Sequence, residues 1–456
     1  MHALGVWLTG LVILVIYSRL SERLAPALGF NPHLVLVVSA AAFVLMILTG
    51  GLGRSLLAKP GITLTLFTIW LMLVTPFSVW KGGSTYLLTD YWSKSYVLYL
   101  ILAGLLVSAE HCRKVLYAIG AAGLIVVATG LLARTSGQRL DLGIGTFSNP
   151  NDLAFYLAFS LPGCVLLVLN SRPFSLLRAA AVATCGSICV LVFLTGSRMG
   201  LLMVLAAFLF LLVTSSLANK IGLLAVGTVL ALIAIATTGS EIRQRYQTMF
   251  GDPVSEFDPT GEVAKAQGST YARKNLLKAS LVLTFKNPLL GVGPGMFNVA
   301  ASEDEYTAKV LSAAWRETHN TFTQVSSETG IPGFLIYMAI IQSVAAAVFR
   351  VWRQTRMRKG FELHSHLAYS LMLMLLIFLV GAMFGSSAYN YFLPTLAGLS
   401  AALARAYDTR AMTLPSAPGA PFPATRSAYG PGRYASTRGA GESASTTQTR
   451  RPRLPR

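Results

Sequence analysis

Charged residues are scarce in this chain. Asp, Glu, Lys and Arg make up 12% of its 456 residues, hydrophobic residues make up 54%, and the mean hydropathy is +0.59. So small a charged fraction cannot cover the surface of a water-soluble globular protein. The composition therefore excludes a soluble enzyme and predicts a polytopic membrane protein.

Cysteine is also rare. The four cysteines, Cys112, Cys164, Cys185 and Cys189, lie at or inside apolar runs and show no paired spacing of metal ligands. Neither a disulfide framework nor a zinc site is therefore indicated.

Long apolar runs, in contrast, are abundant. Runs of about 15 to 20 residues, the length that crosses the hydrocarbon core of a bilayer, predict an all-α fold with about twelve transmembrane helices. They lie near residues 3–17, 34–49, 61–78, 95–108, 115–132, 153–169, 179–195, 199–214, 221–237, 332–351, 367–385 and 391–404. Eleven spans remain an alternative, because only Thr195-Gly-Ser-Arg-Met-Gly200 separates the seventh and eighth runs and the last run is short. The first run lacks a basic segment before it, so we expect a retained helix and not a cleaved signal peptide.

Basic residues are spread unevenly over the connections. With twelve spans, the short loops on the side of the N-terminus carry more Lys and Arg than those opposite, and the positive-inside rule then predicts that both termini are cytoplasmic. We expect transmembrane helices 1–9 within residues 1–238 and helices 10–12 within residues 332–404. Between them, residues 239–331 form one large, partly helical periplasmic loop that carries the catalytic motifs. Residues 405–456 are expected to be a disordered basic cytoplasmic tail.

The net charge of +19 does not indicate a nucleic-acid partner. Residues 239–331 hold nine basic and ten acidic groups, whereas residues 405–456 hold nine basic groups against two acidic ones. Two interpretations of the tail remain open. It contacts anionic membrane lipids, or it is solvated and has no task.

The large loop contains one clear helix signal. Residues 251–268 have no apolar period and are expected to be loop. Residues 271–285 show helical apolar spacing, with Ser269 or Thr270 as the cap and Asn287-Pro288 as the stop.

Histidine is scarce, and only one histidine lies in the large loop. Thr321-Phe-Thr-Gln324 fits a capping box, so a short helix is expected from about Asn320 to Gly330, with Pro332 entering the next span. His319 then sits at the amino end of this helix, where the positive end of the helix dipole disfavours imidazolium and keeps a histidine able to accept a proton. His319 is a candidate general base, although an isolated loop histidine also serves merely to cap or pack.

Two arginines stand out on the predicted outer side. Arg198 lies at the outer end of a span, where a bound anion or simple snorkelling to the interface explains it. Arg273 lies on the helix predicted above and is either an anion ligand or a solvated charge. The amides of Gly291-Val-Gly-Pro-Gly295 either line an anion or form only turns. Together the outer arginines suggest a polyanion. The pyrophosphate of a lipid-linked sugar fits this description, because guanidinium groups can stabilise the charge that develops on it without a metal.

Acidic residues are too sparse to predict a metal site. The first outer loop has only Glu22. Glu303-Asp-Glu305, the one dense acidic cluster of the large loop, is interpreted as a solvated segment, with cation binding as the alternative. Asn149, Asn151 and Asp152 are expected to cap the sixth span, with sugar contact as the alternative.

The order of these motifs resembles the O-antigen ligase and polysaccharide polymerase superfamily of bacterial envelope glycosyltransferases. The resemblance covers roughly residues 149–333. It rests on Ser148-Asn-Pro-Asn-Asp-Leu-Ala154, Thr195-Gly-Ser-Arg-Met-Gly200, Arg273, Gly291-Val-Gly-Pro-Gly295, and His319-Asn320 followed by Gly330-Ile-Pro-Gly333.

This resemblance implies an inverting, metal-independent and cofactor-free transfer of a glycan from undecaprenyl pyrophosphate to a hydroxyl of a lipid, glycan or protein acceptor at the bacterial inner membrane. His319 inherits the role of base, and Arg198 and Arg273 inherit pyrophosphate binding. Other residues of the matching motifs become candidates for substrate contact, namely Asn320, Gly293, Gly295, Asn149 and Asn151. One departure is Phe334, where ligases of lipopolysaccharide often have a small or hydroxylated residue, and this leaves the acceptor open.

Two alternatives to a ligase remain. A polymerase of the same superfamily shares the chemistry and differs only in its acceptor. A transporter or flippase of lipid-linked sugars belongs to another class and would place charged residues within the spans. The predicted spans of this chain are nearly free of such residues, which favours an enzyme.

Overall fold

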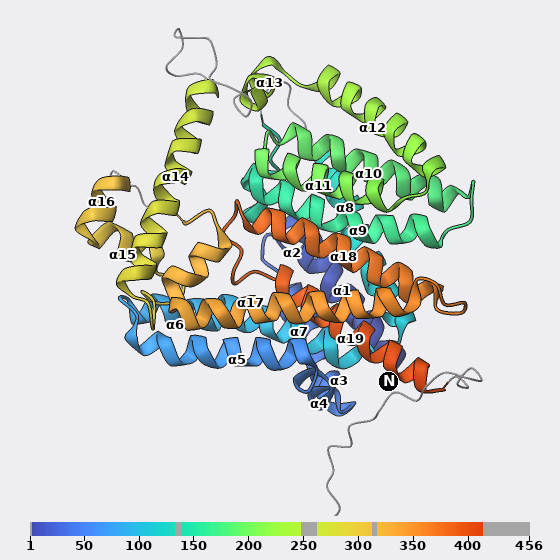
Figure 1. The fold of residues 1–456 in the computed structure, drawn as a ribbon, viewed down its shortest axis with the longest axis horizontal. Coiled ribbons are helices and arrows are strands. Elements are labelled where there is room, and N and C mark those ends of the chain that lie inside the picture. The colour runs from blue at the N-terminus through green and yellow to red at the C-terminus, as the bar shows by residue number, and fades with distance from the viewer. Residues whose placement is uncertain (1, 133–138, 248–261, 312–316, 414–456) are drawn as a thin grey trace, which may run out of the picture. The chain divides into compact units, whose positions relative to one another are not determined.

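The computed structural model describes residues 2–132, 139–247, 262–311 and 317–413, and all regular secondary structure in these ranges is helical. The part up to Met412 forms one compact unit. Its long helices run side by side, and the helices formed by residues 262–311 of the large loop lie at one end of the bundle (Figure 1, left).

Seven described helices are long and apolar enough to cross a membrane. They are α5 (Lys59–Val74, extended by the short helix η1, Thr75–Phe77), α8 (Ala109–Leu132), α9 (Pro150–Asn170), α10 (Leu176–Leu194), α12 (Leu217–Thr237), α17 (Thr321–Thr355) and α18 (Glu362–Ala382). An eighth span results if α1 (His2–Ser18) and α2 (Leu20–Leu28), whose apolar parts are bent by 63°, are taken together. The chain is therefore a polytopic helical membrane protein.

The other predicted runs are also helical but shorter or more polar. They form α3 (Leu34–Leu48), α7 (Ser93–Leu105), α11 (Arg198–Thr214) and α19 (Phe392–Thr413). The count of twelve spans stays a prediction. Short helices complete this part of the chain, namely α4 (Gly51–Leu56), α6 (Lys81–Tyr86), the π-helical turn η2 (Leu87–Trp92) and η3 (Gly145–Ser148).

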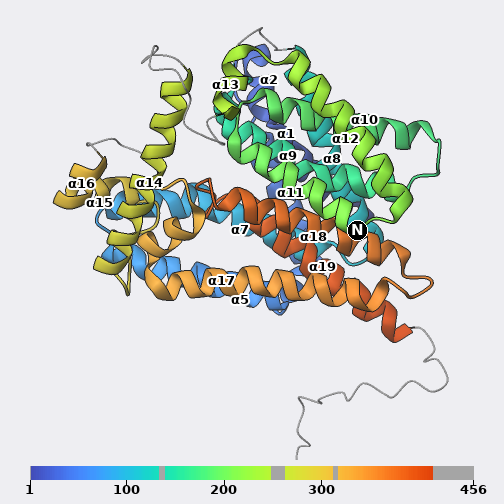
Figure 2. The ribbon, with the colours of Figure 1, turned by 45° about the horizontal axis from the view of Figure 1, so that its top comes forward.

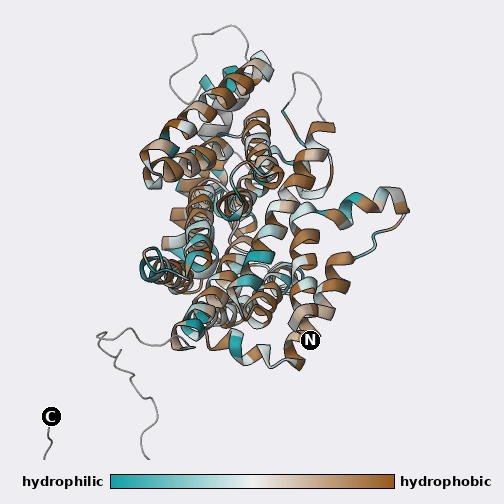
Figure 3. Cartoon of the chain, turned by 90° about the vertical axis from the view of Figure 1, so that its right-hand side faces the viewer, coloured by the Kyte–Doolittle hydropathy of each residue, from teal (hydrophilic) through white to brown (hydrophobic). Residues whose placement is uncertain are grey.

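The bundle has an apolar exterior as well as an apolar core. Helix α9 lies in the interior, whereas α12 lies along one edge (Figures 1 and 2) and exposes large side chains such as Leu217, Ile221 and Leu232. Hydrophobic residues accordingly lie on outward-facing parts of the helices in Figure 3. Exposed apolar surface of this kind is stable only against lipid.

The large loop folds into four helices. These are α13 (Ser240–Gln247), α14 (Glu262–Lys286), α15 (Phe297–Glu303) and α16 (Glu305–Leu311). Helix α14 ends before Asn287-Pro288 as predicted, but it starts at Glu262, so the expected caps Ser269 and Thr270 are wrong and lie inside the helix. The expected loop 251–268 is helical from Glu262, and its earlier part lies outside the described residues.

Helix α17 begins at Thr321, at the position predicted. Its N-cap is the side chain of Asn320, which accepts hydrogen bonds of 3.0 Å from the amides of Phe322 and Thr323, so the predicted capping box headed by Thr321 is wrong. At Gly330 the backbone leaves helical geometry (φ 72°, ψ 179°), and the helix then continues to Thr355. The expected short helix is thus the first segment of a kinked long one.

Helix α19 extends to Thr413, nine residues into the segment 405–456 that the sequence predicts to be a disordered tail. The first part of this segment packs on the bundle, where Ala406 and Tyr407 are buried and Arg405 is anchored. The Arg405 guanidinium donates to the carbonyl groups of Arg54, Ala103 and Leu106. Residues 414–456 lie outside the described part, so the rest of the tail stays a prediction.

Candidate functional site

Five helix ends line one polar cavity of about 330 Å³ beside the large loop. The amino ends of α9, α11, α17 and α19 and the carboxyl end of α18 contribute to it, and α14 closes it with one side chain. The residues that line it are Asn149, Asn151, Asp152, Phe155, Met199, Arg273, Glu317, His319, Phe384, Gly385, Ser386, Ser387 and Asn390. Residues far apart in the sequence therefore meet at one place.

His319 lies in this cavity, directly before the N-cap of α17. Its backbone is left-handed (φ 49°), a conformation that costs a non-glycine residue about 1 kcal/mol or more and persists only where neighbours impose it. Those neighbours are present. The His319 amide donates to Ser386 Oγ at 3.0 Å, and Asn320 Nδ2 donates to the carbonyl of Met383 at 3.1 Å. The loop between α18 and α19 thus holds the backbone of His319 at the positive end of the α17 dipole.

Arg198 is the first residue of α11. The preceding turn is left-handed at Gly196 (φ 62°), and Ser197 caps the helix by accepting from the amide of Gly200 at 3.2 Å. The Ser197 hydroxyl also donates to Asn151 Oδ1 at 2.9 Å, which ties the start of α11 to the start of α9. Arg198 is half-buried and is not itself among the lining residues, but the adjacent Met199 is.

Arg273 reaches the cavity from α14. Burial, together with the nearby positive charge of Arg245, lowers the pKa of the Arg273 guanidinium. Arg198 in turn lies close enough to both Arg245 and Arg273 to be repelled by their charges. The guanidinium groups of Arg198, Arg245 and Arg273, from α11, α13 and α14, are therefore near enough to act on one another, and an anion placed near them is attracted by all three.

Two arginines of this region are not among the site residues predicted from the sequence. Arg245 is 8% exposed and its Nε donates to the carbonyl of Gly196 at 3.0 Å, while Arg139 Nε donates to the carbonyl of Thr195 at 2.9 Å. Both support the turn that positions Arg198. No local signal distinguishes them from other loop arginines, because their partners lie 49 and 56 residues away.

The asparagines at the start of α9 face the same cavity. Asn149 is the N-cap, and its Oδ1 accepts from the amide of Asn151 at 3.0 Å, which confirms Asn149 as a cap, whereas the other two predicted caps, Asn151 and Asp152, lie inside α9. Asn151 has the further link to Ser197. These two residues therefore shape the cavity wall as well as line it.

Two carboxylates that we did not single out as acids also face the cavity. Asp152 and Glu317 are close enough to repel each other. The Glu317 side chain is open to the cavity, yet the protein around it still removes enough water to raise its pKa, and a hydrogen bond with Ser386 opposes this shift. Glu317 lies two residues before His319 in the sequence. Its place in the cavity depends on the hydrogen bond with Ser386, and this contact cannot be predicted from the sequence.

The glycine turn after α14 is placed differently. The amide of Gly293 donates to the backbone carbonyl of Glu328, and the amide of Gly295 donates to the Glu328 carboxylate, both at 2.9 Å. Neither glycine lines the polar cavity. Their amides are thus engaged by α17, and their contact with a substrate stays a prediction.

No group of three His, Cys, Asp or Glu residues able to hold a metal ion occurs within the described ranges. The acidic cluster of the large loop is used in ion pairs, with Asp304 bound to Lys286 and Glu305 bound to Lys309. A cavity with one imidazole, nearby guanidinium groups and amide side chains is suited to binding an anionic group and to moving a proton.

Comparison with known proteins adds one match. Residues 180–338 match the family model described as O-antigen ligase, a range that includes Arg198, Arg273 and His319. No curated protein matches the chain.

Proposed function

Through residues 180–338 the chain belongs to the O-antigen ligase and polysaccharide polymerase superfamily, and we propose that it transfers a glycan from undecaprenyl pyrophosphate to an acceptor hydroxyl. The reaction takes place at the periplasmic face of the bacterial inner membrane. The observation that carries this proposal is the single cavity that His319 and Arg273 line together, with Arg198 beside it.

The arginines bind the pyrophosphate of the donor. A guanidinium group offers two parallel N–H donors to phosphate oxygens and keeps its charge at any physiological pH. As the bond between the anomeric carbon and the pyrophosphate oxygen breaks, negative charge grows on that oxygen. Fixed positive groups in a half-buried site stabilise this charge without reorganisation.

His319 accepts the proton of the acceptor. The acceptor oxygen forms a bond to the anomeric carbon as its proton moves to the imidazole, and the pyrophosphate departs with the bonding electrons. Attack from the face opposite the leaving group inverts the anomeric configuration. Asn320 and the Ser386 hydroxyl hold the His319 backbone, so the imidazole is positioned before substrate binds.

This mechanism needs no metal, because guanidinium groups supply the charge that a divalent cation supplies in other phosphoryl-leaving reactions. We favour a ligase over a polymerase. The two share every step above and differ only in whether the acceptor is a second lipid-linked glycan.

The proposal is tested with purified protein in vesicles, a radiolabelled lipid-linked glycan as donor and candidate acceptors, in the presence of EDTA. We expect transfer, release of undecaprenyl pyrophosphate and an inverted anomeric configuration in the product by NMR. Retention of configuration, or loss of transfer in EDTA with recovery on addition of Mg²⁺, would contradict the mechanism. Use of a second lipid-linked glycan as the preferred acceptor would identify a polymerase.

A further inference from the structure

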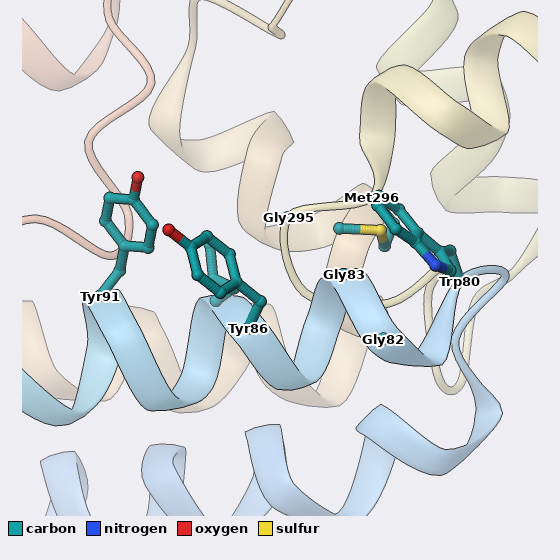
Figure 4. Close-up of a pocket in the computed structure, with 8 residues that line it drawn as sticks. Trp80, Gly82, Gly83, Tyr86, Tyr91, Gly295 and Met296 are labelled. Atoms are coloured by element: carbon teal, nitrogen blue, oxygen red, sulfur yellow. The ribbon is translucent and has the colours of Figure 1, made fainter.

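A second pocket, lined by aromatic residues, lies beside the glycine turn that follows α14. It has a volume of about 360 Å³ and lies between α6–η2 on one side and Gly295 and Met296 on the other (Figure 4). Trp80, Tyr86 and Tyr91 line it and are 56%, 57% and 52% exposed. The transfer mechanism above does not use these residues.

The two tyrosines share the pocket because of the π-helical turn. Residues three or four apart share a face of an α-helix, whereas Tyr86 and Tyr91 are five apart. In η2 the hydrogen bonds span five residues, which brings positions five apart onto one face. The two rings meet edge to face with centroids 5.8 Å apart (Figure 4). Such turns are rare and recur at functional sites.

A glycine shapes the other end of the pocket. A Cβ atom on Gly83 would lie 2.6 Å from the Trp80 ring and 2.7 Å from the terminal methyl of Met296. The absence of a side chain there lets the indole and the thioether lie against α6, as Figure 4 shows. The pocket thus has broad apolar walls at both ends and a floor of bare backbone.

Polar residues lie on the same stretch of chain as the aromatic rings, outside the lining of the pocket. Lys81, Thr85 and Thr89 are exposed on the same short stretch, and Lys94 pairs with Asp90 at 3.5 Å. Such a surface is suited to water and not to hydrocarbon. A pyranose ring matches it, because one face of the ring presents C–H groups that pack on aromatic rings while its hydroxyl groups reach polar neighbours.

The walls of the aromatic pocket and of the polar cavity are held together by buried contacts through the loop between α18 and α19. Trp92, adjacent to Tyr91, packs edge to face on Tyr389, and Ser95 Oγ donates to the Tyr389 carbonyl at 2.9 Å. The Tyr389 hydroxyl donates to the Glu328 carboxylate at 2.7 Å, the same carboxylate that holds Gly295. Ser387 and Asn390 of this loop line the polar cavity.

We propose that the aromatic pocket binds sugar rings of the donor glycan that lie beyond the sugar attached to pyrophosphate. This inference rests on the proposed function. A cavity of about 330 Å³ is of the size that holds a small molecule, whereas the proposed donor carries further sugars beyond the diphosphate and its first sugar. Further sugars then extend beyond the cavity, and the aromatic pocket offers them stacking surfaces.

Kinetics with two donors test the site. One donor carries the full glycan and the other only its first sugar. For Trp80→Ala and Tyr91→Ala we expect KM for the full donor to rise about tenfold, the loss expected for one aromatic contact. KM for the short donor and for the acceptor should stay at the wild-type value, and Trp80→Phe should restore most of the affinity. Tyr306→Ala, which removes an exposed tyrosine of α16, is the control and should change nothing.

A rise in KM for the acceptor alone, or an equal rise for both donors, would overturn the assignment. Direct binding separates this result from failure of the proposed function. The oligosaccharide released by mild acid from the host's lipid-linked glycan is titrated calorimetrically into wild-type and Trp80→Ala protein, and we expect about tenfold weaker binding to the variant. If wild type transfers glycan but both proteins bind the oligosaccharide equally, the pocket assignment fails alone. If binding depends on Trp80 but no transfer occurs, the proposed function fails and the pocket stands.

Discussion

Single residues define the candidate site, and their chemistry was easier to anticipate than their contacts. His319 and Arg273 are predicted as site residues from their positions at a helix start and on the outer side, together with the family resemblance, and the fold brings both to one cavity. Arg139 and Arg245 were missed because their value lies in hydrogen bonds to the turn at residues 195–196, far away in sequence. Residue type can be read from a sequence, whereas such partners require the tertiary fold.

Arg273→Lys tests whether the guanidinium geometry matters. Lysine keeps the positive charge but cannot form two parallel hydrogen bonds to a phosphate, so we expect the transfer rate to fall at least about tenfold. The rate is measured with purified protein and lipid-linked donor. Lys274→Ala, at the next and exposed position of α14, is the control and should keep the wild-type rate. Full activity of Arg273→Lys would show that only charge is needed there.

At the scale of elements, helix interiors and stops were predictable, whereas starts and connections were not. Asn287-Pro288 ends α14 as expected, because proline cannot continue a helix and restricts the residue before it. The predicted start of α14 is wrong because residues 262–268 lack an apolar period and because Ser269 and Thr270 are residue types that often cap helices. Gly291-Val-Gly-Pro-Gly295 could be predicted to form a turn. Its hydrogen bonds to Glu328 in α17 could not be predicted, because no sequence pattern marks a buried glutamate.

This attachment should make the glycine turn intolerant of side chains. Gly293 has φ 107°, and a Cβ atom there would lie 2.0 Å from Ser78 Oγ, so Gly293→Ala should destabilise the protein by about 2 kcal/mol or more. Thermal unfolding in detergent measures the change. The matched control is Gly53→Ala in α4, where nothing lies within 4 Å of the added Cβ and stability should be unchanged or slightly higher. Equal melting temperatures for the two variants would contradict the proposed rigidity of the turn.

At the scale of the whole molecule, apolar runs predicted the helical bundle well, because membrane helices must satisfy their backbone groups internally and so follow local hydropathy. Every predicted run is helical, yet only seven described helices, or eight with the bent pair, are long and apolar enough to count as spans. Helices such as α7 and α11 fall short in length. Their environment depends on neighbours and not on their own sequence, which is why a count from hydropathy is less secure than the fold class.

The predicted orientation places the large loop outside the cytoplasm, and impermeant labelling tests it. Tyr306→Cys introduces an exposed thiol in α16, and Lys359→Cys introduces one in the connection between α17 and α18. In intact spheroplasts, a charged maleimide should label the first variant and not the second, which should react only after permeabilisation. Wild type provides the background from its four cysteines, of which Cys112 and Cys164 are buried. The reverse labelling pattern would place the cavity at the cytoplasmic face.

The rate of glycan transfer by His319→Ala tests the central claim most directly, because every step of the mechanism depends on proton acceptance in that cavity. It is measured with purified protein and lipid-linked donor beside wild type and His33→Ala, which removes an exposed histidine that is also left-handed. We predict a loss of about 10²-fold or more for His319→Ala, with unchanged binding of the donor and a wild-type rate for His33→Ala. Transfer by His319→Ala at the wild-type rate would contradict the account.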